Sequence, residues 1–340
     1  MTFSAPQKRL ALHLLAALGG LSLLGLLIWD IGVHNVVVYL RQIGWSAPLL
    51  LLPALAIVLL DAKGWSNALP TTTFIPHIPL WRWSLARLAG EAVNNLTPTA
   101  GIGGEPVKVY MLRSHGLPAE AGFASVVAAK TALTISQIFF ILLGFPFFLY
   151  RMGWIGQFWW VLAPLLLVAY AFIVVLIRWQ QDGLIAWFVH ILRRILPRWS
   201  RLARWEEHAR QIDGHLFAFY RDNPRGFLSA IVYHFCGWLF GAVEVAFFLY
   251  LMGVSISPVD AFIIETMIQP LTVAGVIIPG SLGVQDAGGV YLCHLLGLDA
   301  GAGLTLMALK RLREAVLNLV GLLALIRVSG TFLPQQARSI

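Results

Sequence analysis

The sequence has few charged residues, few cysteines and none of the common signatures of soluble enzymes. Charged residues make up 12% of its 340 positions, about half the share of an average soluble domain. The two cysteines, Cys236 and Cys293, both lie in apolar segments and form neither a metal-ligand spacing nor a disulfide framework. There is no phosphate-binding P-loop, zinc-protease helix or nucleophile elbow, so no in-chain ATPase or hydrolase site of these kinds is expected.

Histidine does not point to a metal site either. The nine histidines are scattered, no pair has convincing ligand spacing, and we interpret them as structural. We therefore expect no metal, no cofactor and no enzymatic activity from this chain.

Apolar residues are abundant: 59% of the chain is hydrophobic, gathered into runs of roughly 20 residues, the length that spans a bilayer as a helix. The first run follows Lys8 and Arg9 and is too long for a cleaved signal peptide. The sequence predicts an all-α integral membrane protein with about six spanning helices, at roughly 10–29, 45–69, 118–150, 157–178, 225–252 and 300–328.

Two further apolar stretches, 80–116 and 258–297, are interrupted by glycine, proline and acidic residues. Helices do not continue easily through Pro98 or Pro279 with their neighbouring glycines. Non-helical backbone at membrane depth is tolerated where it is buried in protein or lines a cavity. We interpret both stretches as re-entrant hairpins made of broken helices.

The net charge of +8 is explained by membrane orientation rather than by nucleic-acid binding. Nine arginines lie between 178 and 225, and only Arg41 and Arg151 fall on the opposite side of the predicted topology. This bias predicts a multi-pass protein of the bacterial inner membrane with both termini cytoplasmic. The segment 179–224 is then a basic cytoplasmic insertion. Its part 183–196 is amphipathic and is either a helix lying on the anionic leaflet or a basic loop that only sets topology.

The chain also resembles itself at an offset of 181 residues. PTAGIGGEPVKVY at 98–110 aligns with PGSLGVQDAGGVY at 279–291, which pairs Glu105 with Asp286 and Tyr110 with Tyr291. Without a gap, Lys130 then meets Arg311. We infer a first repeat over 1–150 and a second over 151–340. Three crossings separate the hairpins, so the repeat is inverted (3+3), a recurring transporter design.

Ionisable residues at membrane depth are costly and usually face a bundle interior or an aqueous cavity. Glu105 and Asp286 follow the glycine-rich breaks at equivalent positions. One interpretation places them in a central polar site that binds a coupling proton. The other pairs them with Lys130 and Arg311 to hold the fold, and both apply if the pairs break during a transport cycle. Asp61 and Lys63 are a weaker pair near a helix end, which snorkelling explains.

The helix breaks expose backbone groups that bind ions, and Asn94 and Asn95 just before the first break add hydrogen bonds or simply end the helix. A lipid phosphate at the break would lie near Lys108, Lys130 or Arg311. The residues expected to form the substrate or transport site are Glu91, Asn94, Asn95, Pro98, Gly103, Gly104, Glu105, Lys108, Tyr110, Lys130, Glu265, Pro279, Gly280, Gly283, Asp286, Tyr291, Lys310, Arg311, Arg313 and Glu314.

The stretch LAGEAVNNLTPTAGIGGEPVKVYML (88–112) resembles the signature of the flippase-like membrane domain of lysylphosphatidylglycerol synthases, and PGSLGVQDAGGVYL (279–292) resembles its C-terminal companion. LLDAKGWSNALP (59–70) is similar to the stand-alone, hopanoid-associated members. The resemblance covers almost the whole chain. Many relatives have Arg or Glu where this chain has Gln285 and Asp286. The chain ends at Ile340 without a soluble aminoacyl-transferase domain, so lipid aminoacylation is not expected.

The resemblance implies a flippase that moves a polar lipid between leaflets. Its partners would be membrane lipids, anionic or phosphate-bearing, with no nucleic acid and no expectation for the oligomeric state. Two other functions remain open. One is a membrane-embedded lipid-modifying enzyme with Glu91 or Glu105 as general base. The other is a non-transporting scaffold of a lipid-synthesis complex that uses the 178–225 segment.

Overall fold

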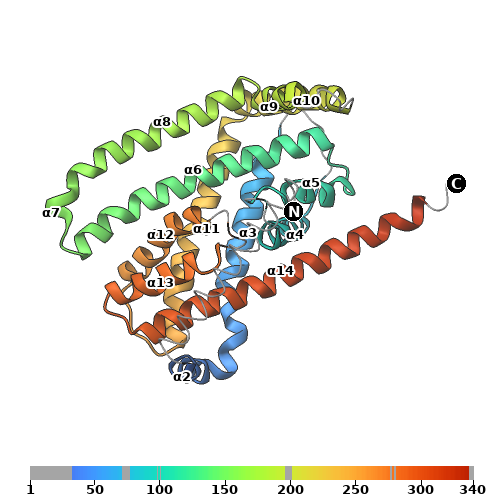
Figure 1. Cartoon of the computed structure of the whole chain (residues 1–340). Coiled ribbons are helices and arrows are strands. Elements are labelled where there is room, and N and C mark those ends of the chain that lie inside the picture. The colour runs from blue at the N-terminus through green and yellow to red at the C-terminus, as the bar shows by residue number, and fades with distance from the viewer. Residues whose placement is uncertain are drawn as a thin grey trace, which may run out of the picture.

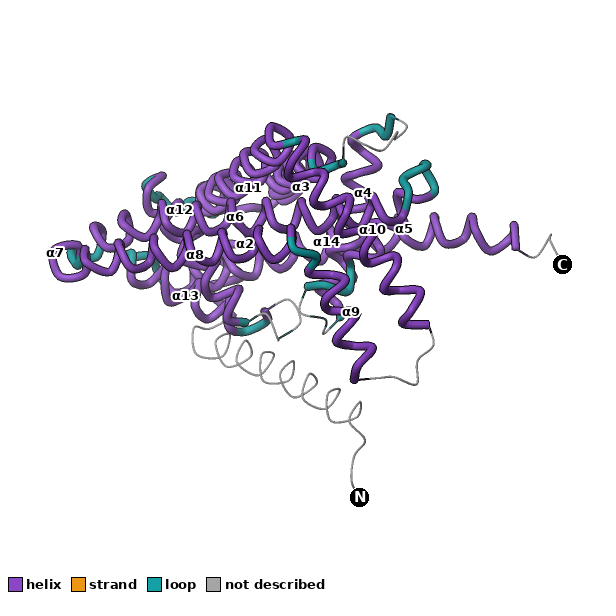
Figure 2. The backbone as a smooth tube through the Cα atoms, turned by 90° about the horizontal axis from the view of Figure 1, so that it is seen from above, coloured by secondary structure: helices purple, strands orange, loops and turns teal. Residues whose placement is uncertain are grey.

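The computed structural model describes residues 33–70, 77–97, 99, 101–195, 201–275, 278 and 281–336, and within them it contains helices and loops but no strand (Figure 2). The predicted first spanning helix, 10–29, lies outside the described residues. The first helix among the described residues is α2 (Val33–Ile43). A 3-10 turn, η1 (Gly44–Leu50), follows it.

Four of the predicted spans are confirmed as helices long and apolar enough to cross a bilayer. They are Val37–Asn67, which includes α3 (Leu51–Asn67); Ala119–Arg151, which is α6; Ile155–Gln181, which includes α7 (Ile155–Phe158), η2 (Trp159–Val161) and α8 (Leu162–Gln181); and Pro224–Leu251, which is α11.

The predicted span at 300–328 is part of one continuous helix, α14 (Ala300–Gln336), but this helix is not among those four. Lys310, Arg311, Arg313 and Glu314 lie within two turns of one another on it. Four charges so close together exceed what a simple apolar span carries, and they face the protein interior instead.

The two interrupted stretches each form a pair of short helices around a break. The first pair is α4 (Leu80–Leu96) and α5 (Glu105–Arg113), and the second is α12 (Pro258–Ala274) and α13 (Val284–Leu295). Within each pair the two helices pack against each other. Figure 1 shows the first pair on the opposite side of the molecule from the second, with α5 nearer the α9–α10 end and α13 nearer α2.

The helices of the two halves correspond in order and exchange their packing partners. Shifted by 181 residues, α3, α4, α5 and α6 overlap α11, α12, α13 and α14. α3 packs against α11, while α4 packs against α14 and α12 packs against α6. Such reciprocal contacts are what an internal two-fold relationship produces.

Each half has its own hydrophobic core. One core is built on α3 to α6 and the other on α11 to α14. Each core also borrows side chains from elsewhere: Leu216 and Phe219 of α10 (Arg201–Asp222) pack into the first, and Ile43 and Leu50 pack into the second. Polar and charged side chains collect between the two cores.

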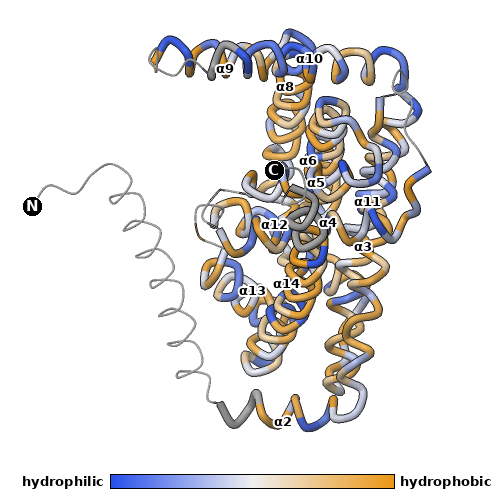
Figure 3. The backbone as a smooth tube through the Cα atoms, turned by 90° about the vertical axis from the view of Figure 1, so that its right-hand side faces the viewer, coloured by the Kyte–Doolittle hydropathy of each residue, from blue (hydrophilic) through white to orange (hydrophobic). Residues whose placement is uncertain are grey.

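The basic insertion forms two helices, α9 (Leu184–Ile195) and α10, which lie across the end of the spanning helices (Figure 3). The amphipathic stretch thus forms a helix over Leu184–Ile195. Trp187, Phe188 and Ile195 are exposed on it, as are Arg193 and Arg194. Asp213 of α10 accepts hydrogen bonds from the backbone N–H groups of Ile185 and Ala186 and so caps the start of α9.

Glu206 joins the two surface helices. Its carboxylate accepts from Arg193 of α9 at 3.0 Å and from Arg210 of α10 at 2.9 Å. The hydrogen bond from Arg193, supported by the one from Arg210, holds the pKa of Glu206 below its ordinary value of 4.5. A carboxylate whose pKa is depressed by folding stabilises the folded contact above the ordinary pKa, and this stabilisation is lost as the pH falls through the lowered value.

We therefore expect α9 to detach from α10 under acid conditions. Hydrogen exchange of α9 amides, corrected for its intrinsic pH dependence, should accelerate as the pH falls below 4.5. Glu206→Gln should exchange fast at every pH, whereas the exposed neighbour variant Glu207→Gln should behave as the wild type. Equal protection of α9 in wild type and Glu206→Gln at neutral pH would contradict this role.

Candidate functional site

The first helix break is stabilised by Asn94 and by two glycines. The Asn94 side chain accepts a hydrogen bond from the backbone N–H of Gly104 at 2.7 Å, just before α5 begins. A Cβ atom on Gly104 would overlap the carbonyl oxygen of Gly90, so α4 and α5 approach closely only because both positions are glycine. Asn94 therefore does more than end α4, since it fixes where α5 starts.

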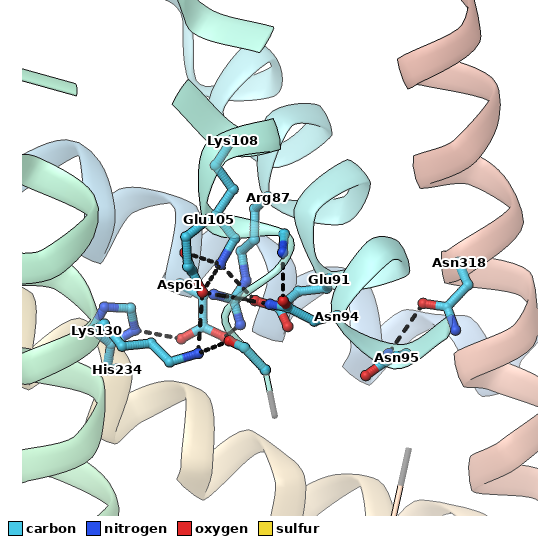
Figure 4. Close-up of polar contacts among 12 residues, drawn as sticks. Asp61, Arg87, Glu91, Asn94, Asn95, Glu105, Lys108, Lys130, His234 and Asn318 are labelled. Carbon is cyan, nitrogen blue, oxygen red and sulfur yellow. Dashed lines mark hydrogen bonds and ion pairs between the residues drawn. The ribbon is translucent and has the colours of Figure 1, made fainter. Parts of the chain in front are cut away.

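Four charged residues around this break form a connected set, which we call the first-half cluster. Lys108 Nζ lies 2.8 Å from Glu91 and 3.0 Å from Glu105. Lys130 of α6 lies 3.1 Å from Glu105 and also donates to the carbonyl oxygen of Gly101 at 3.0 Å. Figure 4 shows these side chains converging from α4, α5 and α6. The predicted pairing of Glu105 with Lys130 is confirmed.

Sequence reasoning missed an adjoining set built on Asp61. Its carboxylate accepts from Arg87 at 2.6 Å and contacts His234 Nδ1 at 2.6 Å (Figure 4). Lys63, the expected neighbour of Asp61, is exposed, whereas Arg87 lies in the polar interior. Asp61 and His234 are separated by 173 positions. The one signal available was an acidic residue, Asp61, inside an apolar run.

The second half contains the equivalent pair. Arg311 of α14 binds Asp286 through two bonds, Nε to Oδ1 at 2.8 Å and Nη2 to Oδ2 at 3.0 Å. Glu314 lies 2.9 Å from the same guanidinium, and Gln285 accepts from it at 3.2 Å. Asp286 also accepts from the backbone N–H of Gly283, whose φ of +80° suits glycine. The predicted pairing of Asp286 with Arg311 is confirmed.

A further charged group lies deeper between α11, α12 and α14. Lys310 lies 2.6 Å from Glu265 and 3.5 Å from Glu244, and Arg313 lies 3.1 Å from Glu244. Glu244 and Lys310 are both buried. Together with Asp286, Arg311 and Glu314 these residues form the second-half cluster. Glu244 is not among the site residues expected from the sequence.

A cavity of about 480 Å³ separates the two clusters and is lined by both halves. Its charged lining is mixed, so a ligand would meet cations and acids side by side. The cations are Arg87, Lys130, Lys310 and Arg313, and the acids are Asp61, Glu91, Glu244, Glu265 and Glu314. Asn94, Asn95, Gln137, Gln269 and Gln285 supply amide groups.

Across the cavity the halves are joined mainly by uncharged hydrogen bonds. Asn95 of α4 donates to Asn318 of α14 at 3.2 Å, and Gln137 of α6 donates to Gln269 of α12 at 3.1 Å. The buried ionisable contact between halves is that of Asp61 with His234. The ion pairs of the two clusters all close within one half.

Most of the predicted site residues are thus brought together, and a few are not. Tyr110 and Tyr291, which correspond in the repeat, are exposed and do not belong to the described cavity lining. Glu105, Lys108, Asp286 and Arg311 belong to the clusters but not to the lining of this cavity, and Gly103, Gly104 and Gly283, which shape the breaks, do not line it either. Pro98, Pro279 and Gly280 lie outside the described residues. Among the residues that the structure describes, no group of three or more His, Cys, Asp or Glu could hold a metal ion.

Comparison with known proteins identifies the family. The model of the family described as "Lysylphosphatidylglycerol synthase TM region" matches residues 11–321. The chain belongs to this family. The match includes both helix breaks, both clusters and every charged residue that lines the cavity.

One relative is a "UPF0104 membrane protein" from the archaeon Methanothermobacter thermautotrophicus. It is 25% identical over 237 residues, which cover 66% of this chain and 68% of the relative. No solved structure matches the chain.

The two equivalent ion pairs should differ in their contribution to stability. Removing one partner of a buried pair costs about 3–5 kcal/mol, since the other charge stays buried and uncompensated. Arg311→Met should approach this cost because the Asp286 side chain is 2% exposed. Lys130→Met should cost less than half as much, because the Lys130 side chain is 43% exposed and Glu105 keeps Lys108.

Equilibrium unfolding in mixed micelles would measure both costs. The double variant Asp286→Asn with Arg311→Met should recover most of the stability, since neither charge then remains alone. If the double variant were as unstable as Arg311→Met, loss of the Arg311 contact with Glu314 rather than the unpaired Asp286 would explain the instability.

Proposed function

We propose that this protein moves a polar lipid between the leaflets of the bacterial inner membrane, passing the headgroup through the cavity between its halves. The observation that carries the proposal is the cavity itself, which both halves line with ionisable side chains among helices that span the bilayer. Ionisable groups at membrane depth are costly, and in membrane proteins they mark substrate or ion paths.

The helix packing fits an inverted repeat, which would support this function. The exchange of packing partners between α4, α14, α6 and α12 fits two halves related by an internal two-fold axis. α3 ends and α6 begins toward the α9–α10 end of the molecule, while α11 ends and α14 begins toward the α2 end (Figure 1). Hairpins that enter from opposite faces fit this arrangement. Rocking of one half against the other would then expose the cavity to each leaflet in turn.

The same proposal includes an orientation in the membrane. The arginine-rich helices α9 and α10 lie at the cytoplasmic face, where the positive-inside rule and anionic lipids favour them. Both termini would then be cytoplasmic. The exposed Trp187, Phe188 and Ile195 of α9 would insert into the leaflet beside the arginines.

The ligand chemistry follows from the cations in the cavity. Lysine and arginine bind phosphate oxygens strongly, and here each one already has a carboxylate partner. A phosphate-bearing headgroup would therefore enter by exchange, displacing a carboxylate such as Glu105 from Lys130. Lys130 is the most exposed of these basic groups, so this exchange is the least hindered.

In this mechanism the lipid leaves chemically unchanged, and the acids pair with cations instead of attacking the substrate. Glu91 is one of the two residues considered above as a general base. Its carboxylate is paired with Lys108 at 2.8 Å. Incubation of purified protein with labelled phospholipids, followed by mass spectrometry, should return the same lipid masses. A protein-dependent product would instead establish a lipid-modifying enzyme.

Neutralising the paired acids should block transfer. In proteoliposomes, Glu105→Gln and Asp286→Asn should each slow the movement of a fluorescent phospholipid about tenfold or more. Without the carboxylate that returns to the basic residue, the phosphate is released slowly, and a charge-assisted contact is worth about 1.5–3 kcal/mol. Arg151→Gln is a matched control, as it breaks an exposed pair with Asp260 at the end of α6, away from the cavity.

Size-exclusion profiles would establish that all three variants fold. Normal transfer by both Glu105→Gln and Asp286→Asn would rule out the acids as part of the path. Co-purification of lipid-synthesis enzymes with a wild-type chain that moves no lipid would favour a scaffold instead.

A further inference from the structure

His234 lies in the middle of α11, is 1% exposed, and has different surroundings at its two ring nitrogens. Nδ1 lies 2.6 Å from Asp61, whose other oxygen accepts from Arg87. A carboxylate that already accepts from a guanidinium orients the ring so that Nδ1 carries its hydrogen toward Asp61. Nε2 has no hydrogen-bond partner among the described residues, although it is buried.

His234 also lines a small cavity, which shares Arg87, Lys130 and Leu133 with the lining of the large one. The small cavity measures about 20 Å³, and the apolar side chains of Val126, Ala129 and Leu133 are part of its lining. About 10–15 Å³ is enough for one water when two to four polar groups surround it. The polar groups here are His234 itself and Trp65, Arg87, Glu105, Lys108 and Lys130.

We propose that this cavity holds one water that connects His234 Nε2 to Glu105, so that Asp61, His234 and Glu105 form a proton-binding site. When the imidazole is protonated, its Nε2–H donates to the water oxygen, and one O–H of the water donates to the Glu105 carboxylate. Moving both hydrogens along these bonds leaves a neutral imidazole, a neutral carboxylic acid and an unchanged water.

The charges that face His234 come from every helix around it. α3 contributes Asp61, and α6 contributes Lys130. Gly241 lies about two turns along α11 from His234 and packs against Glu265 of α12. Glu244, one turn further along α11, accepts a hydrogen bond from Arg313 of α14. α10 meets α11 through Tyr220 and Phe227. Through the small cavity, α4 and α5 contribute Arg87, Glu105 and Lys108. Acids and bases are therefore nearly balanced, and one proton changes the local charge substantially.

The link to lipid transfer rests on the proposed function. When Lys130 leaves Glu105 for a phosphate, Glu105 loses one of its cations. A proton passed from His234 would neutralise it there. Because Asp61 belongs to the first half and His234 to the second, the same proton also alters the buried ionisable contact that joins them.

Nitrogen NMR on the full chain, labelled with 15N-histidine and held in lipid nanodiscs, tests the site directly. The signal lost in His234→Gln identifies His234. We expect this signal to titrate, and Ala129→Val to move its midpoint to lower pH by about one unit, as the added methyl groups expel the water that solvates the protonated ring. Ala171→Val, the same change on the exposed face of α8, should leave the midpoint unchanged.

A His234 signal that does not titrate between about pH 4 and 9, a range that spans ordinary histidine behaviour, would overturn the proposal. So would an unchanged midpoint in folded Ala129→Val. If that variant does not fold, Glu105→Gln replaces it: loss of the acid beyond the water must also lower the midpoint, and no shift refutes the connection. The titration reads proton binding without lipid transfer, so an inactive wild type in proteoliposomes would count against the proposed function alone.

Discussion

The constraint on which the rest of the structure depends is the pairing of charges at membrane depth. A buried lysine or carboxylate in hydrocarbon is tolerated only with a partner, and this chain satisfies the requirement within each half. Glu105 meets Lys108 and Lys130, while Asp286 meets Arg311. These pairs position the helix breaks. α5 begins at Glu105, which pairs with Lys130 of α6, and α13 begins two residues before Asp286, which pairs with Arg311 of α14. The cavity is the space left between two neutralised clusters.

Closing the ion pairs within each half leaves weaker bonds between the halves. Asn95 with Asn318 and Gln137 with Gln269 are amide contacts, which exchange for water or for each other at low cost. An interface of this kind allows one half to move against the other without leaving a buried charge unpaired. The exception is Asp61 with His234, a contact whose strength depends on one proton.

The chain's membership in the family described as "Lysylphosphatidylglycerol synthase TM region" rests on a match over residues 11–321. The matched region ends at residue 321, within α14, and it includes the full set of charged cavity residues. The surface helices α9 and α10 expose arginine and tryptophan side chains at the end of the spanning helices. Under the proposed function, the cavity and the surface helices would both contact lipids with charged headgroups.

Much of this could be predicted from the sequence because the bilayer imposes local rules. Span length predicted α6, α8 and α11 to within a few residues, and glycine and proline located both breaks. The need to neutralise buried charges matched Glu105 with Lys130 and Asp286 with Arg311. The sequence could not reveal that Arg87 turns inward to Asp61, or that His234 completes that set, since these contacts join residues far apart in the chain. Hydropathy and residue spacing predict structure only over a few turns of one helix. Which side chains of α3 contact α11 is decided only when the two halves pack against each other.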